Sequence, residues 1–360
     1  MSNTKELHDL GQSIWLDNIT REILDKGTLR KYMDDLSVTG LTSNPTIFDE
    51  AIGKTSAYDA GIQQKARAKL AGEELFVELA LEDLRRAADL FRPIFERTQG
   101  LDGWVSMEVS PLIANDTKAT IAAALRIHRQ ADRPNLYIKI PGTRAGVPAI
   151  EEAIFSGVPV NVTLLFSREQ YLAVAEAYLR GIERRIAAGL DPRINSVASL
   201  FISRWDRAVA DRVSPELTNR LGIAIAQRTY RAHCELVASQ RWRDLESKGA
   251  RKQRMLWAST GTKDPKASPT LYVEALAAPD TIDTMPEKTL LDFETRGNVK
   301  SVMSEDGGGC EAVLSQFANA GIDIDALATR LQVEGAESFV KSWNELMQRI
   351  ADKSAALATA

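Results

Sequence analysis

A lysine lies in the middle of a short apolar segment, Leu-Tyr-Ile-Lys-Ile-Pro, at residues 136–141. Side chains alternate faces along a strand, so Ile138 and Ile140 share one face and Tyr137 and Lys139 share the other. A lysine that points into an apolar interior loses water, which favours the uncharged amine that can attack a carbonyl. Lys139 is therefore a candidate nucleophile. For one lysine taken alone, the alternative of a strand-end side chain that reaches solvent stays open.

Two carboxylates occupy comparable positions in other apolar segments. Asp17 shares a strand face with Trp15, and Glu108 shares one with Ser106 and Ser110. A lysine with two carboxylates suits imine chemistry. The lysine condenses with a ketone, one carboxylate takes the proton of the hydroxyl whose C–C bond breaks, and the other handles the water of imine formation.

Further polar side chains lie near the ends of the same or neighbouring segments. The polar candidates are Thr42, Asn44, Asn161, Thr163, Ser199, Arg204, Ser259 and Lys263, and Phe201 is an apolar candidate among them. Any one of the polar side chains can be explained as a satisfied hydrogen bond at a strand end, or as a cap of the following helix. Their repetition over seven segments predicts a shared site instead. Ser199, Arg204 and Lys263 are candidates to hold a phosphate, because guanidinium and ammonium groups bind its oxygens.

The segments that must position these residues read as strands alternating with helices. The expected strands are 13–19, 38–44, 103–110, 136–141, 158–166, 196–203, 255–260 and 288–292, and the expected helices are 73–91, 117–131, 146–156, 168–188 and 205–248. Eight alternations predict an α/β fold, a (β/α)8 TIM barrel, whose active site forms at the carboxyl ends of the strands. We expect one domain over residues 1–360, with a loop at 298–310. A C-terminal helical extension follows at about 322–356, capped by Asp323 and mainly structural in role.

Composition excludes several other classes of protein. The chain has 360 residues, 45 basic against 49 acidic side chains and a net charge of −4, so a nucleic-acid partner is not expected. No apolar run is long enough for a membrane span, and no secretory signal is apparent, which predicts a cytoplasmic protein. The three histidines, His8, His128 and His233, fall in helical or terminal segments, so we expect neither a metal nor another cofactor. The two cysteines predict free thiols.

Five of these segments resemble the motifs of the transaldolase family, in the family's order. They are Trp-Leu-Asp (15–17), Gly-Leu-Thr-Ser-Asn-Pro (40–45), Val-Ser-Met-Glu-Val (105–109), Tyr-Ile-Lys-Ile-Pro-Gly-Thr (137–143) and Asn-Val-Thr-Leu-Leu-Phe-Ser (161–167). The resemblance extends to the segment near 288–292. It implies an enzyme of the non-oxidative pentose phosphate pathway that moves a dihydroxyacetone unit between sugar phosphates. The donors would be fructose 6-phosphate and sedoheptulose 7-phosphate, and the acceptors erythrose 4-phosphate and glyceraldehyde 3-phosphate.

The resemblance also implies a role for each candidate. Lys139 would form the Schiff base and Asp17 would be the general acid and base. Glu108 and Thr163 would hold the water that passes protons. Asn44 and Asn161 would bind the dihydroxyacetone hydroxyls, near Phe201. Ser199 and Arg204 would bind the phosphate.

One position departs from the family pattern. Many transaldolases carry a second phosphate-binding arginine shortly after an Ala-Ser pair, and here Gly261 stands near that place, so we assign the role to Lys263. The related fructose 6-phosphate aldolases are shorter and carry glutamine where this chain has Glu108, which favours transfer. That aldolase activity, or a non-catalytic sugar-phosphate-binding barrel, remains an alternative, and the oligomeric state stays open.

Overall fold

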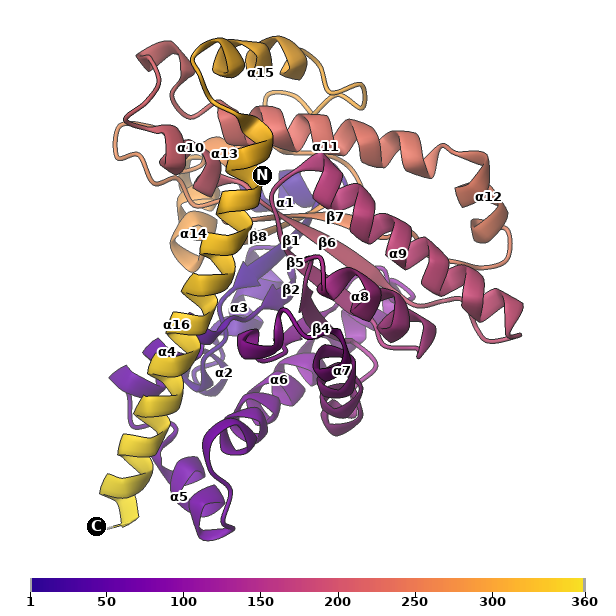
Figure 1. Cartoon of the computed structure of the whole chain (residues 1–360). Coiled ribbons are helices and arrows are strands. Elements are labelled where there is room, and N and C mark those ends of the chain that lie inside the picture. The colour runs from indigo at the N-terminus through magenta and orange to yellow at the C-terminus, as the bar shows by residue number, and fades with distance from the viewer. Residues whose placement is uncertain (1, 359–360) are drawn as a thin grey trace.

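Eight parallel strands form the centre of the molecule in the computed structural model, which describes residues 2–358 (Figure 1). Their order in the sheet is β2-β1-β8-β7-β6-β5-β4-β3. The strands are β1 (Ser13–Asp17), β2 (Val38–Thr42), β3 (Val105–Glu108), β4 (Leu136–Pro141), β5 (Val160–Leu165), β6 (Ser196–Phe201), β7 (Arg254–Ala258) and β8 (Ile282–Met285).

Two backbone hydrogen bonds close this sheet into a barrel. The Gly103 N–H donates to Thr39 O at 2.9 Å, and the Leu41 N–H donates to Trp104 O at 2.9 Å. They join β2 to the residues just before β3, so the two ends of the strand order meet. The predicted (β/α)8 barrel is therefore confirmed.

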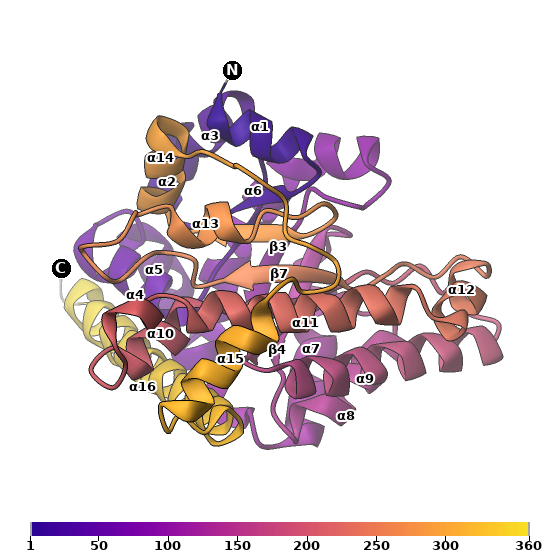
Figure 2. The same ribbon diagram turned by 90° about the horizontal axis from the view of Figure 1, so that it is seen from above.

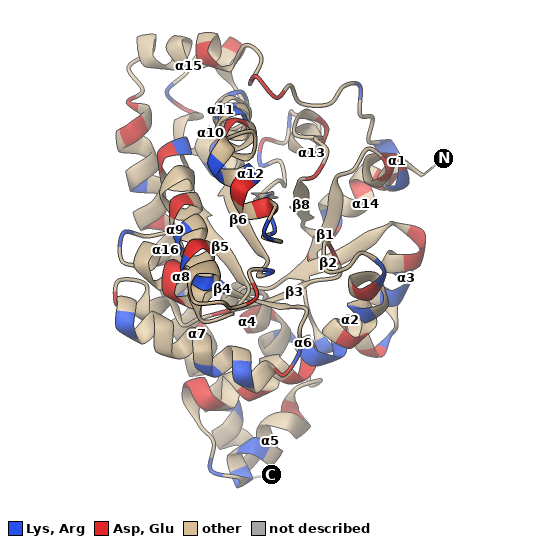
Figure 3. Ribbon diagram, turned by 90° about the vertical axis from the view of Figure 1, so that its right-hand side faces the viewer, with Lys and Arg blue, Asp and Glu red and all other residues tan. Residues whose placement is uncertain are grey.

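Helices surround the barrel and connect successive strands, as Figure 2 shows from above. Before β6 they are α1 (Asn3–Asp9), α2 (Arg21–Asp25), α3 (Thr28–Asp35), α4 (Pro45–Lys54), α5 (Asp59–Arg67), α6 (Gly72–Arg97), η1 (Pro111–Ile113), α7 (Thr117–Ala131), α8 (Gly146–Phe155) and α9 (Arg168–Ala187). After β6 they are α10 (Ser203–Val209), η2 (Pro215–Leu217), α11 (Leu221–Val237), α12 (Gln240–Glu246), α13 (Leu271–Ala275), α14 (Glu287–Arg296), α15 (Cys310–Asn319) and α16 (Ile324–Ala358). Basic and acidic residues are interspersed along these helices (Figure 3).

The eighth predicted strand was wrong. Residues 288–292 lie inside helix α14, and the strand is the preceding segment, Ile282–Met285. Thr289, Leu290 and Phe293 are buried, which is a helical spacing, and Pro286 precedes the first turn, where proline is tolerated. The true strand is harder to recognise because it carries the polar residues Asp283 and Thr284, both of which are buried.

The segment 205–248, which was predicted as one helix, is not continuous. It is divided into α10, α11 and α12, with the 3-10 turn η2 at Pro215 between the first two. Proline lacks the N–H that a continuing helix needs. A second break lies at Ser239, whose side chain accepts from the Trp242 N–H at 3.2 Å and starts α12.

Helix α16 covers nearly the range expected for the C-terminal helical region, whereas α15 was not predicted. Asp323 caps α16 by accepting a hydrogen bond from the Ala326 N–H at 2.9 Å. No helix or strand interrupts 298–309, and α15 precedes α16. Helix α16 runs along one side of the barrel and packs against α4, α5 and α6 (Figure 1). Its far end is fixed by an ion pair from Arg349 Nε to Asp49 Oδ1 at 2.6 Å.

Strand β8 carries a buried carboxyl group. Asp283 is fully buried, its Oδ1 accepts from Thr260 Oγ1 at 2.7 Å, and its Oδ2 has no hydrogen-bond partner within residues 2–358. Burial raises the pKa of Asp283 to about 7. The ionised form therefore destabilises the fold.

We expect the free energy of unfolding to fall as pH rises, because Asp283 becomes ionised in the folded protein only at a cost. Below about pH 4 the side chain is neutral in both the folded and unfolded states, so it imposes no penalty. The penalty grows up to about pH 7 and reaches roughly 4 kcal/mol, at about 1.4 kcal/mol per pKa unit. Asp283→Asn removes the charge, so its Tm should exceed that of the unmodified protein by more at pH 8 than at pH 5. An unchanged Tm difference between the two pH values, measured by calorimetry, would refute this assignment.

Candidate active site

A polar pocket of about 150 Å³ opens at the carboxyl ends of the strands. All of the predicted site residues except Glu108 line it: Asp17, Thr42, Asn44, Lys139, Asn161, Thr163, Ser199, Phe201, Arg204, Ser259 and Lys263. Six different strands or the loops after them supply these side chains. The pocket therefore has the position that active sites take in this fold.

Lys139 lies at the inner end of the pocket and is buried, with 7% of its surface exposed. Its Nζ donates to Ser43 O at 2.7 Å and lies 3.6 Å from Glu108 Oε2. Strand β4 pairs with β3 so that Lys139 is level with Glu108, and with β5 so that it is level with Asn161. The barrel register thus brings the amine and its carboxylate together.

Glu108 is enclosed behind this lysine. Both carboxylate oxygens are buried and make no hydrogen bond in the described part of the chain, and the same is true of Thr163 Oγ1. Burial raises the pKa of Glu108, although the Lys139 ammonium opposes the effect in part. Buried polar atoms without partners are rare, so these three oxygens leave room for a bound water or a substrate hydroxyl.

Asp17 is the second carboxylate, at the end of β1. Its Oδ1 accepts from Thr42 Oγ1 at 2.8 Å, and Thr42 in turn lies 2.7 Å from Thr284 Oγ1. Burial raises the pKa of Asp17, against the opposing charge of Lys139 and the Thr42 hydrogen bond. The hydroxyl chain fixes one oxygen of Asp17, which leaves the other for a reacting group.

Amide and hydroxyl groups form another wall of the pocket. Ser199 Oγ donates to Asn161 Oδ1 at 2.7 Å, and Asn161 Nδ2 donates to Ser106 Oγ at 3.3 Å. Asn44 also caps α4, because its Oδ1 accepts from the Ile47 N–H at 3.1 Å. Capping uses only the oxygen of Asn44 and leaves its amide group for a ligand.

Two cations lie toward the mouth of the pocket. The Arg204 guanidinium lies 5.0 Å from the centre of the Phe201 ring and 5.9 Å from that of Phe339, and it has no ion pair among residues 2–358. Burial lowers the pKa of Arg204. Lys263 is exposed and equally without a carboxylate partner in that range. Two unpaired cations at one mouth suit an anionic ligand.

Backbone strain accompanies two strand ends at this pocket. Ser259 has φ of +59°, and Leu164 has φ of +57°. Leu256 and Ala258 line the pocket, so regular alternation would turn Ser259 toward the helices. The left-handed conformation ends that alternation, and Ser259 lines the pocket as well. Such strain concentrates at functional sites.

Comparison with known proteins agrees with this geometry. The sequence profile described as "Transaldolase/Fructose-6-phosphate aldolase" matches residues 14–350. The chain belongs to this family. It is 43% identical to "Transaldolase" of Saccharopolyspora erythraea, over 98% of each chain, and 42% identical to "Transaldolase" of Thermobifida fusca, over 99% of each. "Transaldolase 2" of Nostoc punctiforme is 40% identical over 97% of this chain and 96% of its own length. These similarities make the chain an enzyme of the transaldolase type.

Sequence reasoning missed several residues that line the pocket of this transaldolase-type enzyme. They are Leu256, Ala258, Gly261, Thr284, Pro286 and Phe339. Thr284 and Pro286 were missed because β8 was misplaced. Phe339 comes from α16, for which we expected a structural role. A helical apolar stripe carries no signal that one of its rings faces a ligand pocket instead of the core.

The histidines lie away from the pocket, in α1, α7 and α11. His233 is buried, and its Nδ1 lies 2.9 Å from Tyr171 Oη. Over residues 2–358, no group of histidine, cysteine, aspartate and glutamate is placed to hold a metal ion. In the same range no helix combines the length and the apolar character that crossing a membrane requires.

Proposed function

We propose that this enzyme transfers a dihydroxyacetone unit between sugar phosphates through a Schiff base on Lys139. The observation that carries the proposal is the buried Lys139 amine 3.6 Å from Glu108, at the inner end of a pocket whose mouth holds two unpaired cations. The amine adds to the ketose carbonyl and water leaves, which gives an iminium. The iminium withdraws electrons, so the C–C bond between its α and β carbons can break and leave a three-carbon enamine on Lys139.

Asp17 supplies the proton transfer of the carbon–carbon step. It takes the proton from the hydroxyl beyond the breaking bond, and the aldehyde product departs. The three-carbon enamine on Lys139 then adds to the carbonyl of the acceptor, and Asp17 returns the proton to the new hydroxyl. Because burial raises the pKa of Asp17, its carboxyl group is better able both to accept and to donate the proton near neutral pH.

Glu108 and Thr163 handle the water of imine formation and hydrolysis. Their unpaired buried oxygens lie beside Lys139, where that water must leave and return. Glu108 receives a proton from the amine and passes it through the water to the departing hydroxyl. Asn44, Asn161 and Ser199 bind the hydroxyls of the three-carbon unit, because their amide and hydroxyl groups line the same pocket as Lys139.

Arg204, Ser259 and Lys263 bind the phosphate at the mouth. The Nζ of Lys263 lies 3.6 Å from where a side chain on Gly261 would begin, so the lysine brings a positive charge close to that position. Ser199 contributes to the inner pocket, since its hydroxyl is engaged with Asn161.

We expect Arg204→Ala to raise KM for fructose 6-phosphate by roughly 10- to 100-fold, because each charge-assisted hydrogen bond contributes about 1.5–3 kcal/mol. The kcat should change less, since Arg204 is remote from Lys139. Lys263→Met should raise KM by only a few-fold because Lys263 is exposed and screened. Lys266→Met, an exposed lysine of the same loop outside the pocket lining, is the matched control. Steady-state kinetics with unchanged KM in both pocket variants would exclude this phosphate site.

Transfer is distinguished from aldol cleavage by its products. With fructose 6-phosphate and erythrose 4-phosphate, we expect sedoheptulose 7-phosphate and glyceraldehyde 3-phosphate. Fast release of free dihydroxyacetone from fructose 6-phosphate alone would support the aldolase alternative. No turnover of either kind by folded protein would support a binding barrel. Transfer would place the enzyme in the non-oxidative pentose phosphate pathway. We further propose that it acts in the cytoplasm and that the barrel and its C-terminal extension form one domain.

A further inference from the structure

Helix α16 forms a wall of the active site. Gln332 Nε2 donates to Gly142 O at 3.0 Å and to Leu164 O at 2.9 Å, which ties the helix to the ends of β4 and β5. Gly335 lies about one turn after Gln332 and is buried. Phe339 lies about one turn after Gly335 and lines the catalytic pocket. The helix is therefore fixed in register over the pocket mouth.

Arg204 is held by this helix on one side and by β6 on the other. Its guanidinium lies between the rings of Phe201 and Phe339, at 5.0 and 5.9 Å from their centres. Gly335 permits the close approach, since a Cβ there would lie 3.1 Å from Arg204 Nη1 and 2.9 Å from Leu164 Cδ2. No carboxylate anchors the guanidinium in residues 2–358, so ring contacts and helix packing fix its place.

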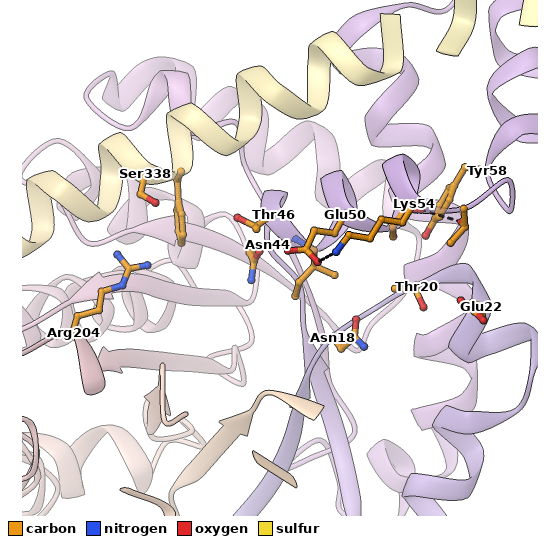
Figure 4. Close-up of a pocket in the computed structure, with 14 residues that line it drawn as sticks. Asn18, Thr20, Glu22, Asn44, Thr46, Glu50, Lys54, Tyr58, Arg204 and Ser338 are labelled. Carbon is orange, nitrogen blue, oxygen red and sulfur yellow. Dashed lines mark hydrogen bonds and ion pairs between the residues drawn. The ribbon is translucent and has the colours of Figure 1, made fainter. Parts of the chain in front are cut away.

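A second and larger cavity lies on the other side of Phe339 and Arg204. We call it the outer chamber, of about 540 Å³, lined by Asn18, Thr20, Glu22, Asn44, Thr46, Ile47, Glu50, Ala51, Lys54, Thr55, Tyr58, Arg204, Ser338 and Phe339. Arg204 and Ser338 lie at one end and Tyr58 at the other (Figure 4). Asn44, Arg204 and Phe339 line both cavities, so they form the boundary between them.

Half of the residues that line the outer chamber are neutral and polar, and the lining also includes the carboxylates of Glu22 and Glu50. Its lysine is already paired, because Lys54 Nζ lies 2.7 Å from Glu50 Oε2. Hydroxyl and amide side chains such as Asn18, Thr46 and Ser338 suit the hydroxyls of a sugar chain. The boundary Arg204 is the one lining cation without a carboxylate partner in the described chain. Arg204 is therefore the unpaired cation available to a phosphate that extends from the catalytic pocket toward the outer chamber.

We propose that Phe339 is a specificity-determining residue that limits the length of the sugar phosphate by fixing Arg204. The inference rests on the proposed function, in which Arg204 binds the phosphate while Lys139 holds the ketone carbon. The separation of these two groups then sets how many carbons lie between them. Without the ring, Arg204 gains freedom toward the outer chamber, and a longer chain reaches it.

The test compares a seven-carbon with a six-carbon ketose phosphate as donor. In Phe339→Ala, the ratio of kcat/KM for sedoheptulose 7-phosphate to that for fructose 6-phosphate should rise by about 3- to 30-fold, the range expected for loss of one cation–π contact. The change should lie mainly in KM for the six-carbon donor. Phe339→Tyr keeps the ring and should restore the original ratio. Glu337→Ala, an exposed change on the same helix, is the control.

A second variant keeps the inference testable if the alanine variant is unstable. Gly335→Ala is favourable for a helix but places its Cβ against Arg204, so it should also displace the guanidinium and shift the ratio. An unchanged ratio in folded Phe339→Ala, or in Gly335→Ala where the former does not fold, would overturn the inference. Borohydride trapping separates the two hypotheses. A normal adduct with an unchanged ratio refutes the role of Phe339 alone, whereas no adduct in the unmodified enzyme refutes the proposed function.

Discussion

Lys139→Met is expected to abolish transfer, with kcat lowered by at least about 10⁴-fold, as for the loss of a covalent nucleophile. No other lysine reaches the inner end of the pocket in residues 2–358, because Lys263 lies at the mouth. Methionine has a similar length and an apolar character, so it fills the space that Lys139 occupies. It also removes the positive charge beside Glu108, which should raise the pKa of that carboxyl further.

The effect of Lys139→Met is measured by a coupled assay for glyceraldehyde 3-phosphate, together with circular dichroism to verify the fold. The matched control is Lys5→Met, a lysine outside both cavities whose exposed ion pair with Asp9 contributes little to stability. That control should retain the adduct and most of the activity. A Lys139→Met variant that still transfers at more than a trace rate would show that another group is the nucleophile.

Asp17→Asn has the second largest expected effect, a fall in kcat of about 10²- to 10⁴-fold, the usual contribution of general acid–base catalysis. Asparagine can keep the hydrogen bond from Thr42 and the shape of the site, but it cannot accept the substrate proton. The iminium on Lys139 should still form, because water handling depends on Glu108. The variant should therefore bind fructose 6-phosphate covalently and fail to cleave it.

Two readouts separate this role of Asp17 from a structural one. Borohydride should trap the full six-carbon sugar on Asp17→Asn and a three-carbon unit on the unmodified enzyme. In the unmodified enzyme, the acid limb of kcat should lie at a pH above the ordinary pKa of an aspartate, since burial raises the pKa of Asp17. Asp25→Asn, an exposed aspartate paired with Arg86, is the control. A three-carbon adduct on Asp17→Asn would contradict the assignment.

The sequence alone allowed most of the barrel and the inner pocket to be predicted. Strand alternation was enough to point Lys139 inward, because 136–141 is a regular strand with isoleucines on its other face. The same logic failed at β8, where the polar pair Asp283 and Thr284 concealed a buried strand and the leucines of α14 imitated one.

What could not be predicted depends on contacts between segments far apart in the chain. Nothing in the apolar stripe of α16 separates Phe339 from Leu331 or Trp343, which are core residues, because the difference arises only when the helix docks over Arg204. The conformation of Ser259 likewise follows from the tertiary structure, since serine has no preference for a left-handed backbone. Local patterns thus predict most of the residues that line the pocket, whereas the boundary of the pocket is set by packing.

The most direct test of the Schiff base is mass spectrometry after borohydride reduction, with fructose 6-phosphate present and no acceptor. We predict a reduced dihydroxyacetone unit on the peptide that contains Lys139, because the three-carbon enamine has no aldehyde to attack and stays on the enzyme. The unmodified protein must first be shown to be folded. An adduct on another lysine, or no adduct at all, would contradict the proposed mechanism.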